Sequence, residues 1–303
     1  MLTVMRVPEF SVIILNYNAA EHVRRCLASL REGCAGLDYE TIVVDNASPR
    51  PGIEAAVAGF PDVRLIRRRR NGGFSAGVNT GLRAARAEAM LVLNPDATLA
   101  PGAAAAMLGF LRGQANVGVV GPRILNEDGS LQLSCRRFPS FSTALFNRYS
   151  LLTRVLPGNR YSARYLMFDW DHRAIGDVDW LSGSAMLLSR AALEAVGLFD
   201  ERYFFAVEDV DLCRRMHDRG YRVVYFPGAE VTHRIGGSSS TAPNRVIVAH
   251  HAGMWRYYRT YLRGGPVLDA VTGTAILARC AAVLAGSNVR RALTRPKRLR
   301  PAT

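Results

Sequence analysis

The first 125 residues alternate apolar, β-branched runs with stretches of helical spacing, and this alternation constrains the fold more than any other feature. Runs of strand character lie at 11–18, 41–48, 63–68, 88–96 and 117–125. Between the first two, Val23, Leu27 and Leu30 recur at helical spacing. Strands that alternate with helices predict a mostly parallel βαβ sheet with helices on both faces. The sequence therefore predicts an α/β fold.

Polar side chains collect where these strands end. The run LVLNPDATL at 91–99 is broken by Pro95, which has no N–H for a sheet ladder, so Asp96 is presented at the carboxyl end of its strand. The other polar residues at strand ends are Asn16, Tyr17, Asn18, Asp45 and Asn46. Ligands of open α/β sheets bind at the carboxyl ends of the strands. We therefore expect a ligand site along this edge.

The alternation weakens after residue 125. LNEDGSLQLSCR predicts a hairpin with its turn at Asp128 and Gly129. An aromatic and basic stretch at 137–176 has no clean period and is interpreted as a lid. Later, AVEDVDLC leads into a helix that ends at Gly220, and a further strand begins at Tyr221.

Composition narrows the class of protein without choosing a partner. Hydrophobic residues make up 49% of the 303 residues, enough for a substantial core. The net charge of +14 is almost wholly arginine, because Lys297 is the single lysine. Arginine suits phosphate-bearing ligands, anionic lipid or nucleic acid, although a GC-rich genome would also favour it over lysine. Five cysteines without a CxxC pair, and an N-terminus unlike a signal peptide, predict a reducing, cytoplasmic location.

Acidic groups and one histidine from separate segments could bind a hard divalent cation. They are Asp96, the acids of AVEDVDLC and His233. Mg²⁺ and Mn²⁺ prefer carboxylate oxygens and tolerate an imidazole. Each residue alone also has a plainer role, in a turn, a helix cap or a packed core. Asp45 could likewise accept from a uracil or thymine base, or cap the next helix with Ser48.

Seven segments in order resemble the family 2 inverting glycosyltransferases of the GT-A fold, most closely the rhamnosyltransferase-like branch of bacterial surface-polysaccharide enzymes. They are SVIILNYNAAEHVRRCLASL, VVDNAS, NGGFSAGVNTGL, LVLNPDATL, WLSGSAMLLSR, FFAVEDVDLCRRMHDRGYRVVYFP and VTHR. The resemblance covers about residues 9–240. It implies a GT-A catalytic domain at 1–240, with a donor half at 9–125 and an acceptor half at 126–240, before a helical, basic segment at 241–303.

The resemblance implies a role for each matched residue. Those that would contact the nucleotide-sugar donor are Leu15, Tyr17, Asp45, Asn71, Gly73, Asn79, Asn94 and Asp96. Those on the acceptor side are Trp180, Ser182, Gly183, Ser184 and Asp211, with Asp211 orienting or capping its helix. Asp96 is the remaining acid of the family's DxD motif, from which Asn94 and Pro95 depart, and with His233 it would bind Mg²⁺ or Mn²⁺.

The acidic cluster matches the family's ED motif, whose carboxylate is the general base. Asp209 is the expected base and Glu208 the second candidate; base action of this kind is worth about 10² to 10⁴ in rate. The QxxRW motif and multiple spanning helices of processive relatives are missing from the sequence. We therefore expect a non-processive, inverting hexosyltransferase that adds one sugar per encounter.

The resemblance favours transfer of L-rhamnose from dTDP-rhamnose to a lipid-linked or polysaccharide acceptor in cell-envelope glycan synthesis. UDP-linked galactose, N-acetylglucosamine or glucuronate is the alternative, because Asp45 does not distinguish uracil from thymine. An alternative from another class is a non-catalytic basic protein that binds nucleic acid or anionic lipid. The sequence has no nucleic-acid-binding signature, so nucleic acid is not an expected partner.

The carboxyl-terminal segment is expected to meet a membrane surface. Its apolar stretch at 267–286 contains Asp269 and Arg279, each of which costs about 2.5 to 3.5 kcal/mol at a bilayer centre, so we expect no span. Trp255 and Tyr258 before it and an arginine-rich tail after it favour a helix among the headgroups of the anionic inner leaflet. The alternatives are packing on the catalytic domain or a homodimer contact. The predicted location is cytoplasmic, peripheral on the inner face of the cell membrane.

Overall fold

The structure is a computed structural model, and it describes residues 7–140, 160–167, 170–234 and 243–294. The predicted lid at 137–176 therefore lies largely outside the described residues. The chain divides into two compact units, Met1–Ser238 and Ser239–Thr303.

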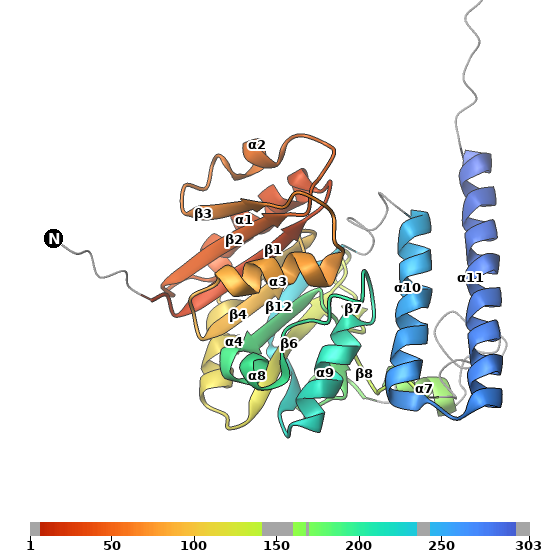
Figure 1. Ribbon diagram of the computed structural model, residues 1–303. Helices are drawn as coiled ribbons and strands as arrows, with labels where there is room; N and C mark the ends of the chain where they lie inside the picture. Colours follow the sequence, from red (N-terminus) through yellow and green to blue (C-terminus); the bar gives the residue numbers. More distant parts are fainter. Residues whose placement is uncertain (1–6, 141–159, 168–169, 235–242, 295–303) are drawn as a thin grey trace, which may run out of the picture. The chain divides into compact units, whose positions relative to one another are not determined.

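The described part of the first unit is built on a ten-stranded mixed sheet in the order β3-β2-β1-β4-β11-β6-β12-β5, with β7 paired to β6 and β9 to β12 (Figure 1). Its strands are β1 (Phe10–Asn16), β2 (Tyr39–Asp45), β3 (Val63–Arg67), β4 (Ala89–Leu93), β5 (Ala97–Leu99), β6 (Val117–Leu125), β7 (Leu131–Gln132), β9 (Gly176–Asp177), β11 (Ala185–Ser189) and β12 (Arg222–His233). Strands β3, β2, β1 and β4 pair in parallel, which confirms the predicted βαβ arrangement.

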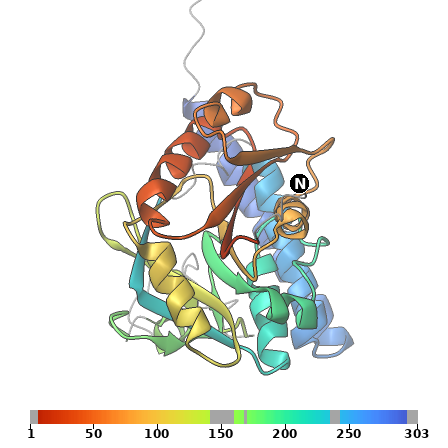
Figure 2. The same cartoon turned by 90° about the vertical axis from the view of Figure 1, so that its left-hand side faces the viewer.

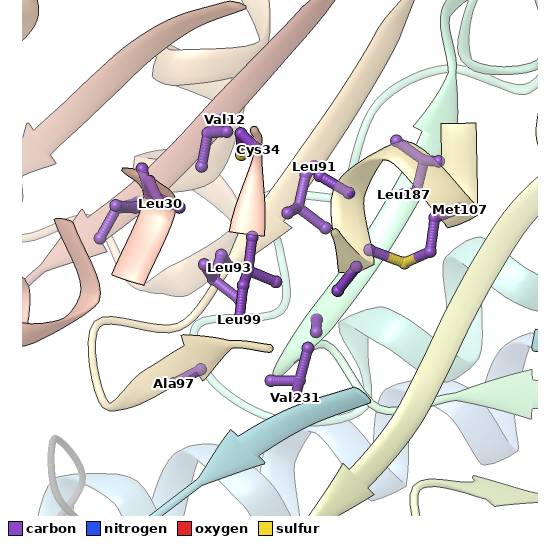
Figure 3. Packing of buried hydrophobic residues seen from close by; sticks show 14 of the residues in the cluster. Val12, Leu30, Cys34, Leu91, Leu93, Ala97, Leu99, Met107, Leu187 and Val231 are labelled. Carbon is purple, nitrogen blue, oxygen red and sulfur yellow. The ribbon is translucent and has the colours of Figure 1, made fainter. Parts of the chain in front are cut away.

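Helices cover both faces of this sheet. They are α1 (Ala20–Gly33), α2 (Ile53–Val57), α3 (Phe74–Ala84), α4 (Ala103–Arg112), α8 (Arg190–Val196) and α9 (Glu208–Asp218). A further helix, α7 (Arg160–Leu166), contacts the short strand β8 (Cys135–Arg136) outside the main sheet. In Figure 2, α4 (yellow) and α1 (red) lie in front of the sheet. Their apolar side chains pack on β1, β4, β11 and β12, as Figure 3 shows for Leu30 and Met107 beside Val12, Leu91 and Leu187. This core fixes the strands whose ends carry the polar residues.

A break in one strand carries Asp96 to its place. Strand β4 ends at Leu93, as Pro95 predicts, and the chain resumes as β5, which leaves β4 and pairs antiparallel with β12. In that pairing Ala97 lies opposite His233. The predicted hairpin is also present, because β7 folds back on β6 with Gln132 opposite Ile124. Asp96 and His233 are neighbours because β5 turns back and pairs with β12.

A short antiparallel ribbon stands beside the main sheet. In it β8 (Cys135–Arg136) pairs with β10 (Trp180–Leu181), and Trp180 lies opposite Arg136. The chain then continues into β11, which runs antiparallel between β4 and β6. The residues between β10 and β11 are therefore held close to the carboxyl end of β4.

The second unit contains α10 (Pro243–Tyr257), a π-helical turn η2 (Tyr258–Leu262) and α11 (Pro266–Thr294), with α10 and α11 packed together. Pro266–Leu293 is long and apolar enough to cross a membrane, with a mean hydropathy of 1.7. The argument that two charges exclude a span is therefore not upheld.

The two charged residues in the apolar stretch of α11, Asp269 and Arg279, are both engaged within this unit. Asp269 accepts a hydrogen bond of 2.8 Å from the Tyr258 hydroxyl, and Arg279 lies 2.9 Å from Nε2 of His251. Linear reading of the sequence could not reveal this, because it does not say which helix face is covered. The exposed apolar residues of α11 are Val267, Leu268, Val271, Leu277, Val283, Val289 and Leu293.

Candidate active site

A carboxylate and an imidazole nitrogen meet where β5 pairs with β12. Oδ1 of Asp96 is 3.3 Å from Nε2 of His233. On the other side of the ring, Nδ1 of His233 lies 2.8 Å from Oε1 of Gln132, which can only accept. Nδ1 therefore carries a hydrogen, and Nε2 faces Asp96 and the side-chain amide of Asn94, which is 3.3 Å away.

This donor set fits a hard divalent cation. A carboxylate oxygen and an imidazole nitrogen are ligands that Mn²⁺ and Mg²⁺ accept, and here they lie 3.3 Å apart. Among the described residues no group of three or more His, Cys, Asp or Glu side chains forms a metal cluster. Asp96 and His233 would thus supply two ligands, and oxygens of a bound diphosphate are suited to supply others.

A second carboxylate lies at the start of α9. Asp209 is half-buried; its Oδ2 accepts from the Gly183 amide at 3.0 Å and its Oδ1 from the Val210 amide at 2.9 Å. Burial raises the pKa of Asp209, although hydrogen bonds from Gly183 and Val210 oppose that rise. A raised pKa makes a carboxylate a stronger base, so this group suits proton abstraction.

Its neighbour Glu208 is placed differently. Its side chain is 5% exposed, and Oε2 has no hydrogen-bond partner among the described residues. Burial, and then the charge of Asp209, raises the pKa of Glu208 well above its usual range. Glu208 is almost wholly buried, whereas Asp209 is only half-buried and can be reached from solvent, which is consistent with the prediction of Asp209 as the base.

One backbone strip joins the two acidic positions. The backbone N–H of Asn94 donates to the Ser184 carbonyl at 2.9 Å. The backbone N–H of Gly183, the residue before Ser184, donates to the Asp209 carboxylate. The hydroxyl oxygens of Ser182 and Ser184 are 3.1 Å apart on the same strip. The structure therefore brings the predicted acceptor residues together between the Asp96–His233 pair and the predicted base.

Trp180 begins this strip and is held firmly. It is 7% exposed, and its indole N–H donates to the Arg137 carbonyl at 2.9 Å. The guanidinium carbon of Arg136 lies 5.1 Å from the ring centroid. This burial corresponds to packing in the core, and a role of Trp180 in the acceptor wall stays a prediction.

The predicted donor loop is tied to the segment that precedes α9. Gly73 has φ +91°, and a Cβ there would overlap the Phe204 carbonyl, so only glycine fits. Asn71 accepts from the Gly73 amide at 2.9 Å. Asn79 is buried and exchanges two hydrogen bonds with the Phe199 backbone, of 2.8 and 3.1 Å. These residues hold the loop and the 199–206 segment together.

The end of β1 and β2 forms a compact polar turn. Asp45 is 1% exposed and accepts from Asn16 at 2.7 Å and from the Ser48 hydroxyl at 2.6 Å. The predicted helix cap is not formed, because α2 begins after Gly52 without a side-chain cap; Asp45 instead holds the turn at 45–48, and a contact to the base stays a prediction. Leu15 packs against Gly77 of α3, and Tyr17 is partly exposed beside them.

Asp211 lies in a different environment from Asp209. It is buried and pairs with Arg215 at 2.9 Å, while Arg215 donates to the carbonyls of Val196 and Leu198. This arrangement corresponds to the predicted orienting role. A direct contact of Asp211 with the acceptor stays a prediction without support from its burial.

Sequence reasoning missed several residues that shape this site. Gln132, which sets the tautomer of His233, could have been found only from the register of the β6–β7 hairpin. Ser75 donates to the Tyr203 carbonyl at 2.9 Å and pins the same segment as Asn79. Ala206 and Val207 have φ of 63° and 73°, a costly conformation for a β-branched residue, immediately before the two acids.

A mixed sheet with Asp96 in the turn between β4 and β5, and a second carboxylate held by the strip before β11, is the arrangement of a glycosyltransferase of the GT-A type. The sequence profile of glycosyl transferase family 2 matches residues 11–181, and that of glycosyl transferase family group 2 matches residues 139–279. The chain belongs to glycosyltransferase family 2, and the resemblance found in its motifs is confirmed.

Relatives and solved structures agree with this assignment. The chain is 32% identical over 282 residues to the N-acetylglucosaminyl-diphospho-decaprenol L-rhamnosyltransferase of Mycobacterium tuberculosis, across 85% of this chain and 90% of that protein. It is 28% identical over 211 residues to a low-salt glycan biosynthesis hexosyltransferase of Haloferax volcanii, across 68% and 61%. A mannosyltransferase from Pyrobaculum calidifontis, solved with GDP-Man and Mn²⁺, superposes with a TM-score of 0.57 at 20% identity, across 96% and 82%. That last likeness supports the fold.

Proposed function

We propose that this enzyme transfers L-rhamnose from dTDP-L-rhamnose to a lipid-linked acceptor in cell-envelope glycan synthesis. The observation that carries the proposal is the strip at 182–184, which hydrogen-bonds to Asn94 on one side and to Asp209 on the other. The mycobacterial relative, whose name states a rhamnosyl transfer to N-acetylglucosaminyl-diphospho-decaprenol, supports the choice of sugar and acceptor. We assign residues 9–125 to the donor half and 126–240 to the acceptor half.

The chain's own residues account for the proton and for the placing of the donor. Held by Asp96 and His233, a divalent cation would neutralise charge on the diphosphate leaving group. Asp209 accepts the proton of the acceptor hydroxyl as the bond from that oxygen to C1 of the sugar forms. The bond from C1 to the diphosphate breaks on the opposite face, which inverts the configuration. The Gly183 amide keeps Asp209 oriented.

Donor identity is decided by a direct comparison. Purified enzyme with Mn²⁺ is offered dTDP-rhamnose, UDP-galactose, UDP-N-acetylglucosamine and UDP-glucuronate, with an N-acetylglucosaminyl diphosphate lipid as acceptor. We expect transfer from dTDP-rhamnose alone. Transfer from a UDP-sugar instead would replace the donor and leave the enzyme class intact. The alternative of a non-catalytic binding protein is not supported, because the chain belongs to an enzyme family.

We also propose that the second unit attaches the enzyme to the cytoplasmic face of the membrane. The face of α11 that α10 leaves uncovered carries apolar side chains from Val267 to Val289, whereas Asp269 and Arg279 are engaged within the unit. Arg290 and Arg291 follow at its end and suit anionic headgroups. Flotation with vesicles of phosphatidylglycerol and with vesicles of phosphatidylcholine tests this; we expect binding to both, and stronger binding to the first.

A further inference from the structure

A positively charged side chain with an unused donor lies beside the proposed acceptor wall. Arg136 is opposite Trp180 in the β8–β10 ribbon and stacks over its ring. Its Nε is buried and has no hydrogen-bond partner among the described residues, and its hydrogen bond from Nη2 to the Leu133 carbonyl is long, at 3.5 Å. Because buried donors are normally satisfied in folded proteins, this guanidinium is suited to bind a ligand.

The neighbouring Arg137 differs from Arg136 in its exposure and in its ion pairing. Arg137 is exposed and pairs with Asp179 at 3.1 Å. Arg136 forms no ion pair within the described parts of the chain, yet its charge reaches the base: burial raises the pKa of Asp209, and Arg136 acts against that rise. The Arg136 side chain also hydrogen-bonds to the Tyr165 phenol: burial raises the pKa of that phenol, and the charge and hydrogen bond of Arg136 oppose the rise. Among the described residues, the unused donor of Arg136 is therefore its Nε alone. Arg136 thus stacks on Trp180 of the proposed acceptor wall, and its charge acts on the base.

We propose that Arg136 binds the diphosphate that joins the acceptor sugar to its lipid. The inference rests on the proposed function and adds a subsite to it. A sugar that packs on Trp180 with its hydroxyl at Asp209 carries its anomeric phosphate a few ångströms away along the same wall. A guanidinium presents paired N–H groups that fit phosphate oxygens, and the stacking on Trp180 fixes its plane. The enzyme would accordingly select glycosyl diphosphate lipids over sugars that lack the diphosphate.

The test compares two acceptors that differ only in this group. One is N-acetylglucosaminyl diphosphate on a short alkyl chain, and the other is the alkyl N-acetylglucosaminide without phosphate. For Arg136→Gln we expect a KM for the diphosphate acceptor raised about 10- to 100-fold, the range for loss of a hydrogen-bonded charged contact. The KM for the phosphate-free acceptor and for the donor should not change. Arg137→Gln is the matched control and should leave all three unchanged.

Other outcomes overturn the assignment. An equal rise in KM for both acceptors would show that Arg136 only supports Trp180 or the base. A raised KM for the donor would show that Arg136 binds the donor diphosphate instead. Calorimetric binding of the two acceptors without donor decides the same question even if dTDP-rhamnose is not the donor. If Arg136→Gln fails to fold, Arg136→Lys, which keeps a positive charge, is tested in its place. Its loss of affinity should again be confined to the diphosphate acceptor.

Discussion

At the scale of single residues, the roles of two adjacent acids can be separated. Asp209→Asn removes the proton acceptor but keeps the shape and one acceptor atom for the Gly183 amide. We expect turnover to fall by about 10²- to 10⁴-fold while calorimetric binding of dTDP with Mn²⁺ is kept. Asp218→Asn, at the exposed end of the same helix, is the control and should retain full activity. Wild-type rates in Asp209→Asn would exclude it as the base.

Glu208 is expected to affect the stability of the fold, and this effect should become less favourable as pH rises. A carboxyl whose pKa is raised on folding stabilises the folded state below its ordinary pKa, about 4.3, and loses that contribution as pH rises through the raised value. Glu208→Gln removes this titration. Its Tm should exceed that of the wild type at pH 8, by about 2 to 4 °C for each kcal/mol regained, and match it at pH 4. Glu194→Gln, exposed on α8, should show no such pH-dependent gain.

Gln132 offers a test of the cation site that leaves both predicted ligands in place. Without its carbonyl oxygen, Nδ1 of His233 loses the acceptor that fixes the tautomer. We expect Gln132→Ala to weaken Mn²⁺ binding in the presence of dTDP by about 10- to 100-fold, as for other partners of metal ligands. Electron paramagnetic resonance of free Mn²⁺ measures this. Gln114→Ala, on the exposed surface, is the control; equal affinity in the two variants would contradict the assigned tautomer.

The residues of the site were predictable to different degrees. Asp96, His233, Asp209 and Gly183 belong to contiguous motifs with recognisable order, so the sequence could nominate them. Gln132 lies in no motif, and its contact depends on the register between β7 and the end of β12. The same holds for the burial of Asn79, whose partners lie about 120 residues further along the chain.

At the scale of elements, α11 carries the membrane prediction. Leu277 is 72% exposed in the middle of its uncovered face. A charge there should oppose contact with hydrocarbon, so Leu277→Asp should reduce the fraction of enzyme that floats with vesicles while activity on a short-chain acceptor is kept. Ile175→Asp, which changes an exposed apolar residue of the first unit, is the control. Equal flotation of Leu277→Asp and wild type would show that this face is not what binds.

Strands with strong local signals were predicted well, and those defined by distant pairing were not. The parallel strands β1 to β4 are predictable because each is a β-branched run that lies between amphipathic helices. β11 has a similar run, but nothing local says that it enters antiparallel between β4 and β6. For α11 the composition was correctly read, yet the positions of Asp269 and Arg279 relative to α10 decide which face is apolar, and a linear sequence does not contain that.

At the scale of the whole molecule, ligand binding should stabilise the fold in a way that depends on the cation. Nucleotide bound at about 100 times its Kd adds about 2.7 kcal/mol to stability. We expect dTDP to raise the Tm of the wild type with Mn²⁺, and to raise it much less with a chelator. In Asp96→Asn the Mn²⁺-dependent part should be lost. A shift that is the same with chelator, or the same in Asp96→Asn, would remove Asp96 and the cation from donor binding.

The strip at 182–184 has one more consequence. Because backbone amides and carbonyls make its links to Asn94 and Asp209, the spacing between leaving-group side and base side does not depend on which side chains the strip carries. If the proposed function holds, exchange of the partly exposed Ser182 for another small residue is expected to alter which sugar is accommodated and to leave these backbone links in place. Directed evolution of this position could therefore change sugar selectivity while the catalytic residues stay the same.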